Sequence, residues 1–284
     1  MCALFTVALS NHRTEIIPLA VAKMVRCETV VLEEPPEANF GAMLTGDVAI
    51  DDYVMGIDTE YPSFSRAMCR ALRKLYDQGI RIVQVEPYLA RLTEIHERLG
   101  EGARPEELRP DPRLWPVYQM ERETTQTLMA FYKAFTVGDF NRMLAAVKRF
   151  ARVDAQRFYM RDRLRAQKIA ALATGKRIYV EAGQMHVGLV SLLRRRVKGW
   201  ATVTADYLVS AALSSCARPK VLFGPGDVLT LLYIFNPRFD GARNGPADPP
   251  AAPPTWPGSR RRGRPRRRPG TGPCLWREIR RRRR

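Results

Sequence analysis

Closely spaced cysteines are missing from this chain of 284 residues. The five cysteines are odd in number and widely scattered, at Cys2, Cys27, Cys69, Cys216 and Cys274. No two of them have the short spacing of a zinc knuckle or of a redox-active dithiol, which argues against both kinds of site. We therefore expect reduced thiols and a cytoplasmic location, since disulfides persist mainly in oxidising compartments.

Long uncharged apolar segments are also missing. A membrane-spanning helix needs about 18 or more consecutive apolar residues, and no segment of the chain approaches that length. The first apolar run, residues 3–9, has no basic residue before it, as a secretory signal would have. We therefore expect no membrane span, and we interpret residues 3–9 as a first strand.

The rest of the composition is that of an ordinary globular protein, with 45% hydrophobic and 27% charged residues. The net charge of +18 is unevenly distributed. Residues 258–284 contain 13 arginines and one glutamate, a charge of +12, which leaves +6 for the first 257 residues. The sequence therefore predicts one soluble domain over residues 1–237 and a separate basic tail over residues 238–284.

The basic tail is rich in arginine, proline, glycine and alanine. Such a composition cannot bury enough apolar surface to order the chain, so we expect disorder. Because these four residues have GC-rich codons, our first hypothesis is that the reading frame shifted near residues 235–243. The second is an arm that binds nucleic acid or another polyanion nonspecifically. The third is an AT-hook at 262–265, whose Arg-Gly-Arg-Pro would lie in a narrow minor groove.

Apolar strand-like runs alternate with helical periodicity along the first 200 residues. The strands are expected at residues 3–9, 28–33, 80–86 and 177–181, and the helices at 14–26, 63–78, 117–135, 140–172 and 187–196. Strands that are apolar along most of their length are typical of a parallel sheet covered on both faces. We predict an α/β fold with a long helical insertion before the last strands. Residues 201–226 have no clear pattern.

Polar side chains stand at the carboxyl ends of the predicted strands, where parallel α/β sheets bind their ligands. They are His12 with its neighbour Asn11, then Glu33, then Glu86, and finally Glu181 with His186. An isolated charge at a buried sheet edge is costly, so this accumulation predicts a polar site.

Each of these residues also has a purely structural interpretation. His12 would cap the helix that starts at Thr14, Glu86 would cap the helix after Pro87, and Glu181 would form a structural ion pair. Glu33 and Glu34, which precede two prolines, would belong to a solvated turn, an interpretation that suits Glu34 better.

The predicted helix 140–172 supports the functional interpretation. Residues on one of its faces change from apolar near Phe150 to charged at Asp154, Arg161 and Arg165. A buried guanidinium needs a carboxylate or an anionic ligand, and the strand-end glutamates would supply the carboxylates. The alternative is that Arg165 reaches water and that Arg161 makes a single structural pair.

Two segments of the sequence together resemble the signature of a known group of proteins. Residues 161–166, RDRLRA, are followed by RIYVEAGQMHVG at 177–188, in which residues 183–186 form Gly-x-x-His. This arrangement resembles a signature of the erythromycin esterase, ChaN and TraB/PrgY group, in which a helix with Arg-Asp precedes a strand and a histidine turn. Residues 10–15, SNHRTE, are similar to the first motif of that group. Leu9 departs from it, because the esterases have a glutamate there.

The resemblance implies roles for four of these residues. His12 would be the general base or a metal ligand, with His186 as its partner across the site. Glu33 would orient His12 or coordinate the metal, and Arg161 would hold an anionic group or a developing oxyanion. His12, His186 and Glu33 would then be the ligands of a divalent metal such as zinc or manganese.

The function we expect is therefore hydrolysis of an ester or amide bond in a small molecule or peptide, with or without a metal. Two alternatives stay open at this point. The first is a protein of the same fold that binds haem or a peptide without catalysis. The second is polyanion binding through the basic tail.

Overall fold

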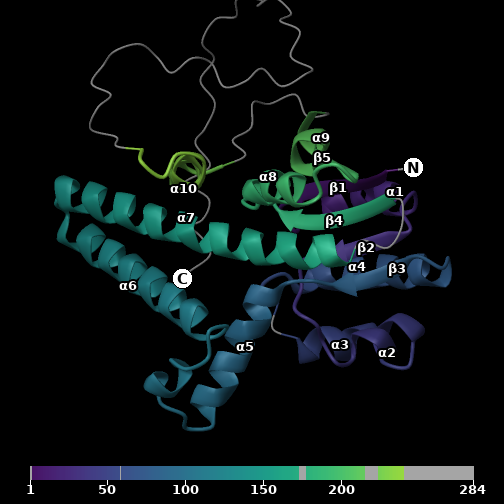
Figure 1. Cartoon of the computed structure of the whole chain (residues 1–284), viewed down its shortest axis with the longest axis horizontal. Helices are drawn as coiled ribbons and strands as arrows, with labels where there is room; N and C mark the ends of the chain where they lie inside the picture. The colour runs from purple at the N-terminus through teal and green to yellow at the C-terminus, as the bar shows by residue number, and fades with distance from the viewer. Residues whose placement is uncertain (1, 58, 173–176, 215–222, 240–284) are drawn as a thin grey trace, which may run out of the picture. The chain divides into compact units, whose positions relative to one another are not determined.

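A computed structural model describes residues 2–57, 59–172, 177–214 and 223–239 (Figure 1). The chain divides into a compact unit, Met1–Phe239, and the remainder, Asp240–Arg284. The first unit ends close to the predicted boundary at residue 237. Residues 240–284 lie outside the described part of the chain. The predictions of a disordered tail and of an AT-hook-like segment fall on these residues.

Five strands of the described residues form one parallel sheet in the order β3-β2-β4-β1-β5. They are β1 (Ala3–Ser10), β2 (Thr29–Leu32), β3 (Arg81–Gln84), β4 (Arg177–Gly183) and β5 (Ala201–Tyr207). The predicted α/β fold is thus confirmed, and β5 lies in the segment that had no clear pattern. Because β4 lies between β1 and β2, strands distant in sequence end side by side at the centre of the sheet.

Helices connect the strands and continue beyond the last one. They are α1 (Ile17–Met24), α2 (Phe40–Thr45), α3 (Ile50–Gly56), α4 (Pro62–Asp77), α5 (Pro87–Gly100), α6 (Trp115–Val137), α7 (Phe140–Ala171), α8 (Val187–Arg196), α9 (Leu208–Ser214) and α10 (Pro225–Phe235). Short 3-10 turns cover Thr14–Ile16 and Pro105–Leu108. The predicted long helical insertion is confirmed as α6 and α7, which with α5 separate β3 from β4.

Proline and glycine set several of these boundaries. Helices α4, α5 and α10 begin at Pro62, Pro87 and Pro225. Proline lacks a backbone N–H group, and at the first position of a helix that group would have no acceptor within the helix. Gly79 follows α4 with a φ of 81°, a left-handed conformation that suits glycine at a helix end. The prediction that the third strand continues to Glu86 was wrong. Strand β3 ends at Gln84, because Glu86 is already the N-cap of α5.

Two apolar layers cover the sheet. Alternate side chains of β1 point to opposite faces, so Phe5, Val7 and Leu9 belong to one core and Ala8 to the other. The Phe5 face packs against α7 and α8, and the Ala8 face packs against α1 and α4. The carboxyl ends of the central strands therefore lie between two helical layers, as Figure 1 shows.

Helices α6 and α7 form an antiparallel hairpin that extends beyond the sheet (Figure 1). Gly138, with a φ of 78°, joins the two helices, and the carboxylate of Asp139 caps α7 by accepting a bond from the Arg142 N–H at 3.0 Å. Tyr233 of α10 packs against Ala151 and Ala155 of α7. None of the helices in the described part of the chain is long and apolar enough to cross a membrane.

Candidate functional site

Six charged side chains converge at the carboxyl edge of the sheet, and we call them the polar cluster. They come from the residue after β2, the N-cap of α5, the face of α7 and the turn after β4, and they are Glu33, Glu86, Arg161, Asp162, Arg165 and His186. Strand pairing aligns the edge, because Ser10 at the end of β1 lies opposite Gly183 at the end of β4.

His186 lies between two carboxylates. Its Nε2 atom is 2.7 Å from Oε1 of Glu33, and its Nδ1 atom is 2.5 Å from Oδ1 of Asp162. Burial alone would lower the pKa of His186, but the two carboxylates raise it to about 9. The imidazole is therefore a cation at neutral pH, and both of its N–H groups donate to carboxylates.

Glu33 is the acceptor at the centre of the polar cluster. Besides His186, it faces Nη2 of Arg161 at 3.3 Å and Nη1 of Arg165 at 3.4 Å, and it accepts the backbone N–H of Gly183. Burial alone would raise the pKa of Glu33, but the cations of His186, Arg165 and Arg161 hold it well below the usual value. Glu33 is therefore ionised, and its hydrogen-bonded imidazole is that of His186 rather than that of His12.

The two arginines of α7 differ in their access to solvent. Arg165 is fully buried, and it donates from Nε to the Val85 carbonyl at 3.0 Å and from Nη2 to the Glu181 carbonyl at 2.8 Å. The alternative in which Arg165 reaches water is therefore wrong. The Arg161 side chain is 13% exposed, so its guanidinium borders the polar cluster on the solvent side.

Glu86 combines its two predicted roles. Its Oε1 atom accepts the Leu89 N–H at 3.4 Å and so caps α5. Its Oε2 atom lies 3.3 Å from Nε of Arg165 and 3.6 Å from Nη2 of Arg161. The side chain is fully buried, and the two guanidinium groups compensate its charge.

Asp162 had no predicted role, although it is part of the Arg-Asp segment. Asp162 is fully buried. It lies four residues after Phe158 and three before Arg165, so helical spacing places it near the charged face of α7. This spacing is the sequence feature that could have predicted its role. Gly188 in the first turn of α8 permits this placement. A Cβ atom at Gly188 would lie 2.8 Å from Oδ2 of Asp162, so a side chain there would have to displace the carboxylate.

His12 approaches the same edge from β1. Its backbone has a φ of 51°, a left-handed conformation that is uncommon outside glycine and is often found at functional sites. The half-buried ring packs against Tyr61 and Phe64, with ring centroids 5.7 and 5.3 Å away. Burial lowers the pKa of His12, and the nearby charge of Glu33 only partly opposes this effect. His12 is therefore a neutral imidazole at neutral pH.

Gly183 lies between the two histidines. A Cβ atom at this position would be 3.5 Å from Cε1 of His12, 3.5 Å from Cδ2 of His186 and 3.6 Å from Oε2 of Glu33. These are ordinary van der Waals distances, so the space would hold a methyl group without displacing its neighbours. The glycine leaves this small space free between a neutral and a cationic imidazole.

Two further carboxyl groups nearby titrate around neutral pH. Burial and the charge of Glu33 raise the pKa of Glu181 to about 7. Burial and the charge of Glu181 raise the pKa of Glu34 to about 7, against the effect of a 2.9 Å hydrogen bond from Gln84. Glu34 lies in the bend after β2 and is partly exposed, as a turn residue is expected to be.

Unsatisfied polar atoms concentrate at this edge. Within the described residues, the buried side-chain nitrogen and oxygen atoms without a hydrogen-bond partner are Asn11 Oδ1, Glu86 Oε2, Arg161 Nε, Asp162 Oδ2 and Arg165 Nη1. Four of them belong to the polar cluster, and Asn11 immediately precedes His12. Such atoms are rare in folded proteins, because each carries a desolvation cost of about 1–3 kcal/mol.

Asp154 was expected at the polar site, and His12, Glu33 and His186 were expected to bind a metal. The structure supports neither expectation. The carboxylate of Asp154 accepts bonds from Arg157 of the same helix at 3.1 and 2.8 Å, so it pairs within α7 rather than joining the polar cluster. Across the described part of the chain, no three His, Cys, Asp or Glu side chains are grouped so that they could hold a metal ion. The predicted set of His12, Glu33 and His186 does not fit, because carboxylates occupy both ring nitrogens of His186.

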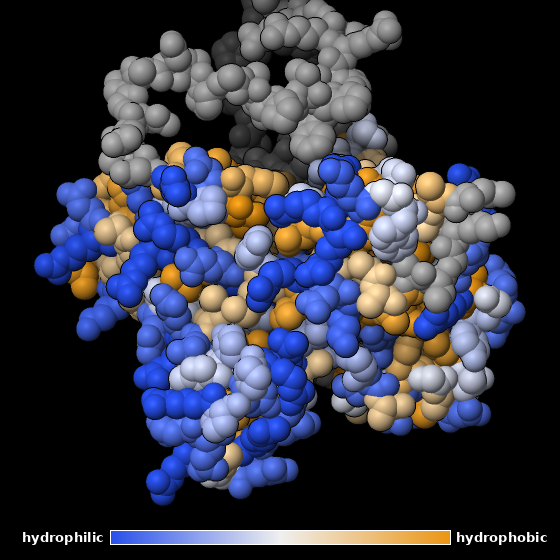
Figure 2. Space-filling model, viewed as in Figure 1, coloured by the Kyte–Doolittle hydropathy of each residue, from blue (hydrophilic) through white to orange (hydrophobic). Residues whose placement is uncertain are grey.

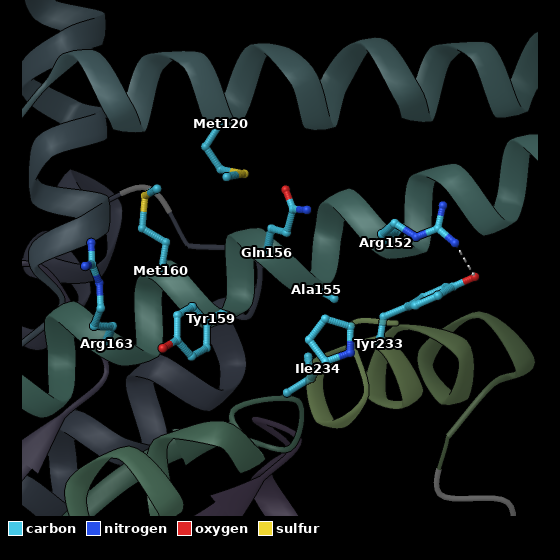
Figure 3. Close-up of a pocket in the computed structure, with 10 residues that line it drawn as sticks. Met120, Arg152, Ala155, Gln156, Tyr159, Met160, Arg163, Tyr233 and Ile234 are labelled. Atoms are coloured by element: carbon cyan, nitrogen blue, oxygen red, sulfur yellow. Dashed lines mark hydrogen bonds between the residues drawn. The ribbon is translucent and has the colours of Figure 1, made fainter. Parts of the chain in front are cut away.

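Two cavities lie elsewhere on the molecule. One, of about 470 Å³, opens between α6, α7 and α10, where Arg152 donates to the Tyr233 hydroxyl at 3.4 Å (Figure 3). The other, of about 300 Å³, lies between α5 and α6 and includes His96. No residue of the polar cluster lines either cavity.

Comparison with known proteins assigns no family. No protein-family model matches the chain, and no solved structure matches it significantly. An uncharacterized protein of Archaeoglobus fulgidus is 27% identical over 229 residues, which are 81% of this chain and 75% of the archaeal protein. The resemblance to the erythromycin esterase, ChaN and TraB/PrgY group therefore stays a prediction.

Proposed function

We propose that this chain is a hydrolase that cleaves an ester or amide bond at the carboxyl edge of the sheet. One observation carries the proposal. The unsatisfied buried polar atoms of the described residues all lie in or beside the polar cluster, next to a neutral histidine with a left-handed backbone. A bound polar substrate and its attacking water would satisfy those atoms.

His12 is the proposed general base. Its lowered pKa leaves the imidazole neutral, so one ring nitrogen is free of a proton and can take one from a water molecule. His186 is unsuited to this task, because its raised pKa keeps it protonated. The two histidines therefore have different roles, which their surroundings set.

Arg161 is the proposed stabiliser of the negative charge that develops on the substrate. Nε of Arg161 has no hydrogen-bond partner, and Glu33 and Glu86 hold the guanidinium in position from its Nη2 side. Arg165 is fully buried, and its role is to hold Glu33 in place. Donors that are already oriented in a buried site stabilise an oxyanion at little reorganisation cost. Glu181, with a pKa of about 7, is the proposed acid that protonates the leaving group.

Turnover of p-nitrophenyl esters and of a fluorogenic peptide library tests the proposal. We expect His12→Ala to lower kcat/KM by about 100-fold or more, the usual contribution of a general base. His96→Ala is the matched control, since His96 is the remaining histidine and lies on α5 away from the polar cluster. Equal turnover by His12→Ala and the parent protein would remove His12 from the reaction.

A further inference from the structure

The far end of the α6–α7 hairpin carries an accumulation of exposed apolar side chains. We call residues 129–144 the hairpin tip. Its large exposed apolar residues are Met129 (60%), Tyr132 (53%), Phe135 (64%), Val137 (59%), Phe140 (66%) and Leu144 (37%). Single exposed apolar residues are ordinary on soluble proteins, but a contiguous group marks an interaction surface.

The exposed residues surround the end of the hairpin instead of forming one stripe. At about 100° per residue, Phe135, Tyr132, Met129 and Val137 together span roughly 200° of the circumference of α6. Phe140 adds a further exposed ring in the first turn of α7. Packing against the side of another helix needs a narrower stripe on one face. A helix end with apolar side chains over about 200° of its circumference is instead suited to insertion into an apolar medium.

Basic side chains accompany this apolar end. The hairpin tip contains Lys133 and Arg142 against the single acid Asp139, and Lys148 and Arg149 follow further along α7. Asp139 itself faces Nε of Arg142 at 3.6 Å. In Figure 2, hydrophobic and hydrophilic residues alternate at the left of the view, where Figure 1 places the α6–α7 turn. A second copy of the same tip would bring like charges together, whereas an anionic lipid surface would attract them.

We propose that the hairpin tip binds the surface of an anionic lipid bilayer, with its aromatic and aliphatic side chains inserted among the headgroups. Such insertion reaches about 5–10 Å into the interface and needs no spanning helix. Phe131, Tyr132 and Phe135 form an aromatic group with centroid distances of 5.7 and 6.5 Å from Phe131. Aromatic rings favour this interfacial depth. The proposal is independent of the proposed hydrolase activity.

Vesicle flotation of the full-length protein is the test, with phosphatidylcholine vesicles that contain or lack phosphatidylglycerol. Because the arginine-rich tail can also bind anionic lipid, binding is compared at about 0.1 M and about 1 M salt, where the Debye lengths are about 10 and 3 Å. We expect Phe135→Ser with Phe140→Ser to reduce the salt-resistant binding at least tenfold. The matched control is Met55→Ser with Tyr76→Ser, which are 79% and 42% exposed outside the hairpin.

Hydrogen exchange locates the contact, and circular dichroism confirms that each variant is folded. We expect anionic vesicles to slow exchange in residues 134–144. Equal flotation of the double variant and its control, or slowed exchange confined to the tail, would overturn the proposal. Concentration-dependent dimers that are lost in the double variant, with no vesicle binding by the parent, would identify a second copy as the partner and would also overturn it.

Discussion

The Nδ1 atom of His186 donates a hydrogen bond to Oδ1 of Asp162 at 2.5 Å, and both side chains are buried. The opposite ring nitrogen donates to Glu33 at 2.7 Å. A histidine that bridges two carboxylates is stabilised as a cation, and this cation compensates charge in a cluster that also holds two arginines. The pair thus links α7 to the turn after β4 and keeps the polar cluster electrically balanced.

The stability of the protein should fall as the pH rises above neutrality. The pKa of His186 is about 9 in the folded protein, above the 6.5 of a free histidine. The resulting stabilisation is fully present below pH 6.5 and is lost as the pH rises toward 9. Its size is of order 3 kcal/mol, from about 1.4 kcal/mol per pKa unit. Urea unfolding at a series of pH values measures it, and His186→Gln should remove this pH dependence. A parent protein with constant stability from pH 6 to 9 would contradict it.

Asp162→Asn should lower the pKa of His186, because the variant removes one of the two charges that hold the proton. We expect a decrease of about 1–2 pKa units, the usual effect of a neighbouring charge in a buried site. NMR titration of the imidazole protons measures the shift. Asp154→Asn is the matched control, since Asp154 pairs with Arg157 on the same helix. A His186 pKa that is unchanged in Asp162→Asn would show that this carboxylate is not the cause.

Glu33→Gln should destabilise the fold strongly. The substitution leaves His186, Arg161 and Arg165 without their shared carboxylate, and removing one partner of a buried ion pair costs about 3–5 kcal/mol. Chemical denaturation measures the loss of free energy. Glu37→Gln should change stability little, because Glu37 is exposed. A Glu33→Gln protein as stable as the parent would mean that solvent already compensates these charges.

Gly183→Ala should separate activity from stability. The added methyl group fits at ordinary contact distances, so we expect the melting temperature to change by only a few degrees. It would also occupy the space between His12 and His186, beside the proposed general base, so turnover should fall by about tenfold or more. Gly41→Ala, with no atom within 4 Å of the new Cβ, is the control. Full turnover in Gly183→Ala would move the reaction away from this space.

The activity should have a bell-shaped dependence on pH. His12 must be deprotonated to act as base, so kcat/KM should rise with pH through its lowered pKa, below 6.5. Glu181 must be protonated to act as acid, so the rate should fall above its pKa of about 7. In Glu181→Gln the upper limb should be absent while the lower limb persists. A single rising limb in the parent protein would exclude Glu181 as the acid.

The apolar periodicity of the sequence was sufficient to predict the parallel α/β fold and the long helical insertion. Strand ends could be placed to within a few residues, so the sequence alone assigns Glu33, Glu86 and His186 to one edge of the sheet. The reason is that the burial pattern of a strand or helix is local. It can be recognised from the spacing of apolar residues a few positions apart in the sequence.

The pairing of side chains was decided by the tertiary structure alone. The order of the strands, with β4 between β1 and β2, brings Glu33 to His186 rather than to His12. The packing of α7 against α8 brings Asp162 to His186 and leaves Asp154 with Arg157. Contacts between residues far apart in sequence depend on distances of a few ångströms between whole elements. No local pattern encodes those distances, and they determine which groups are charged and which atoms stay unsatisfied.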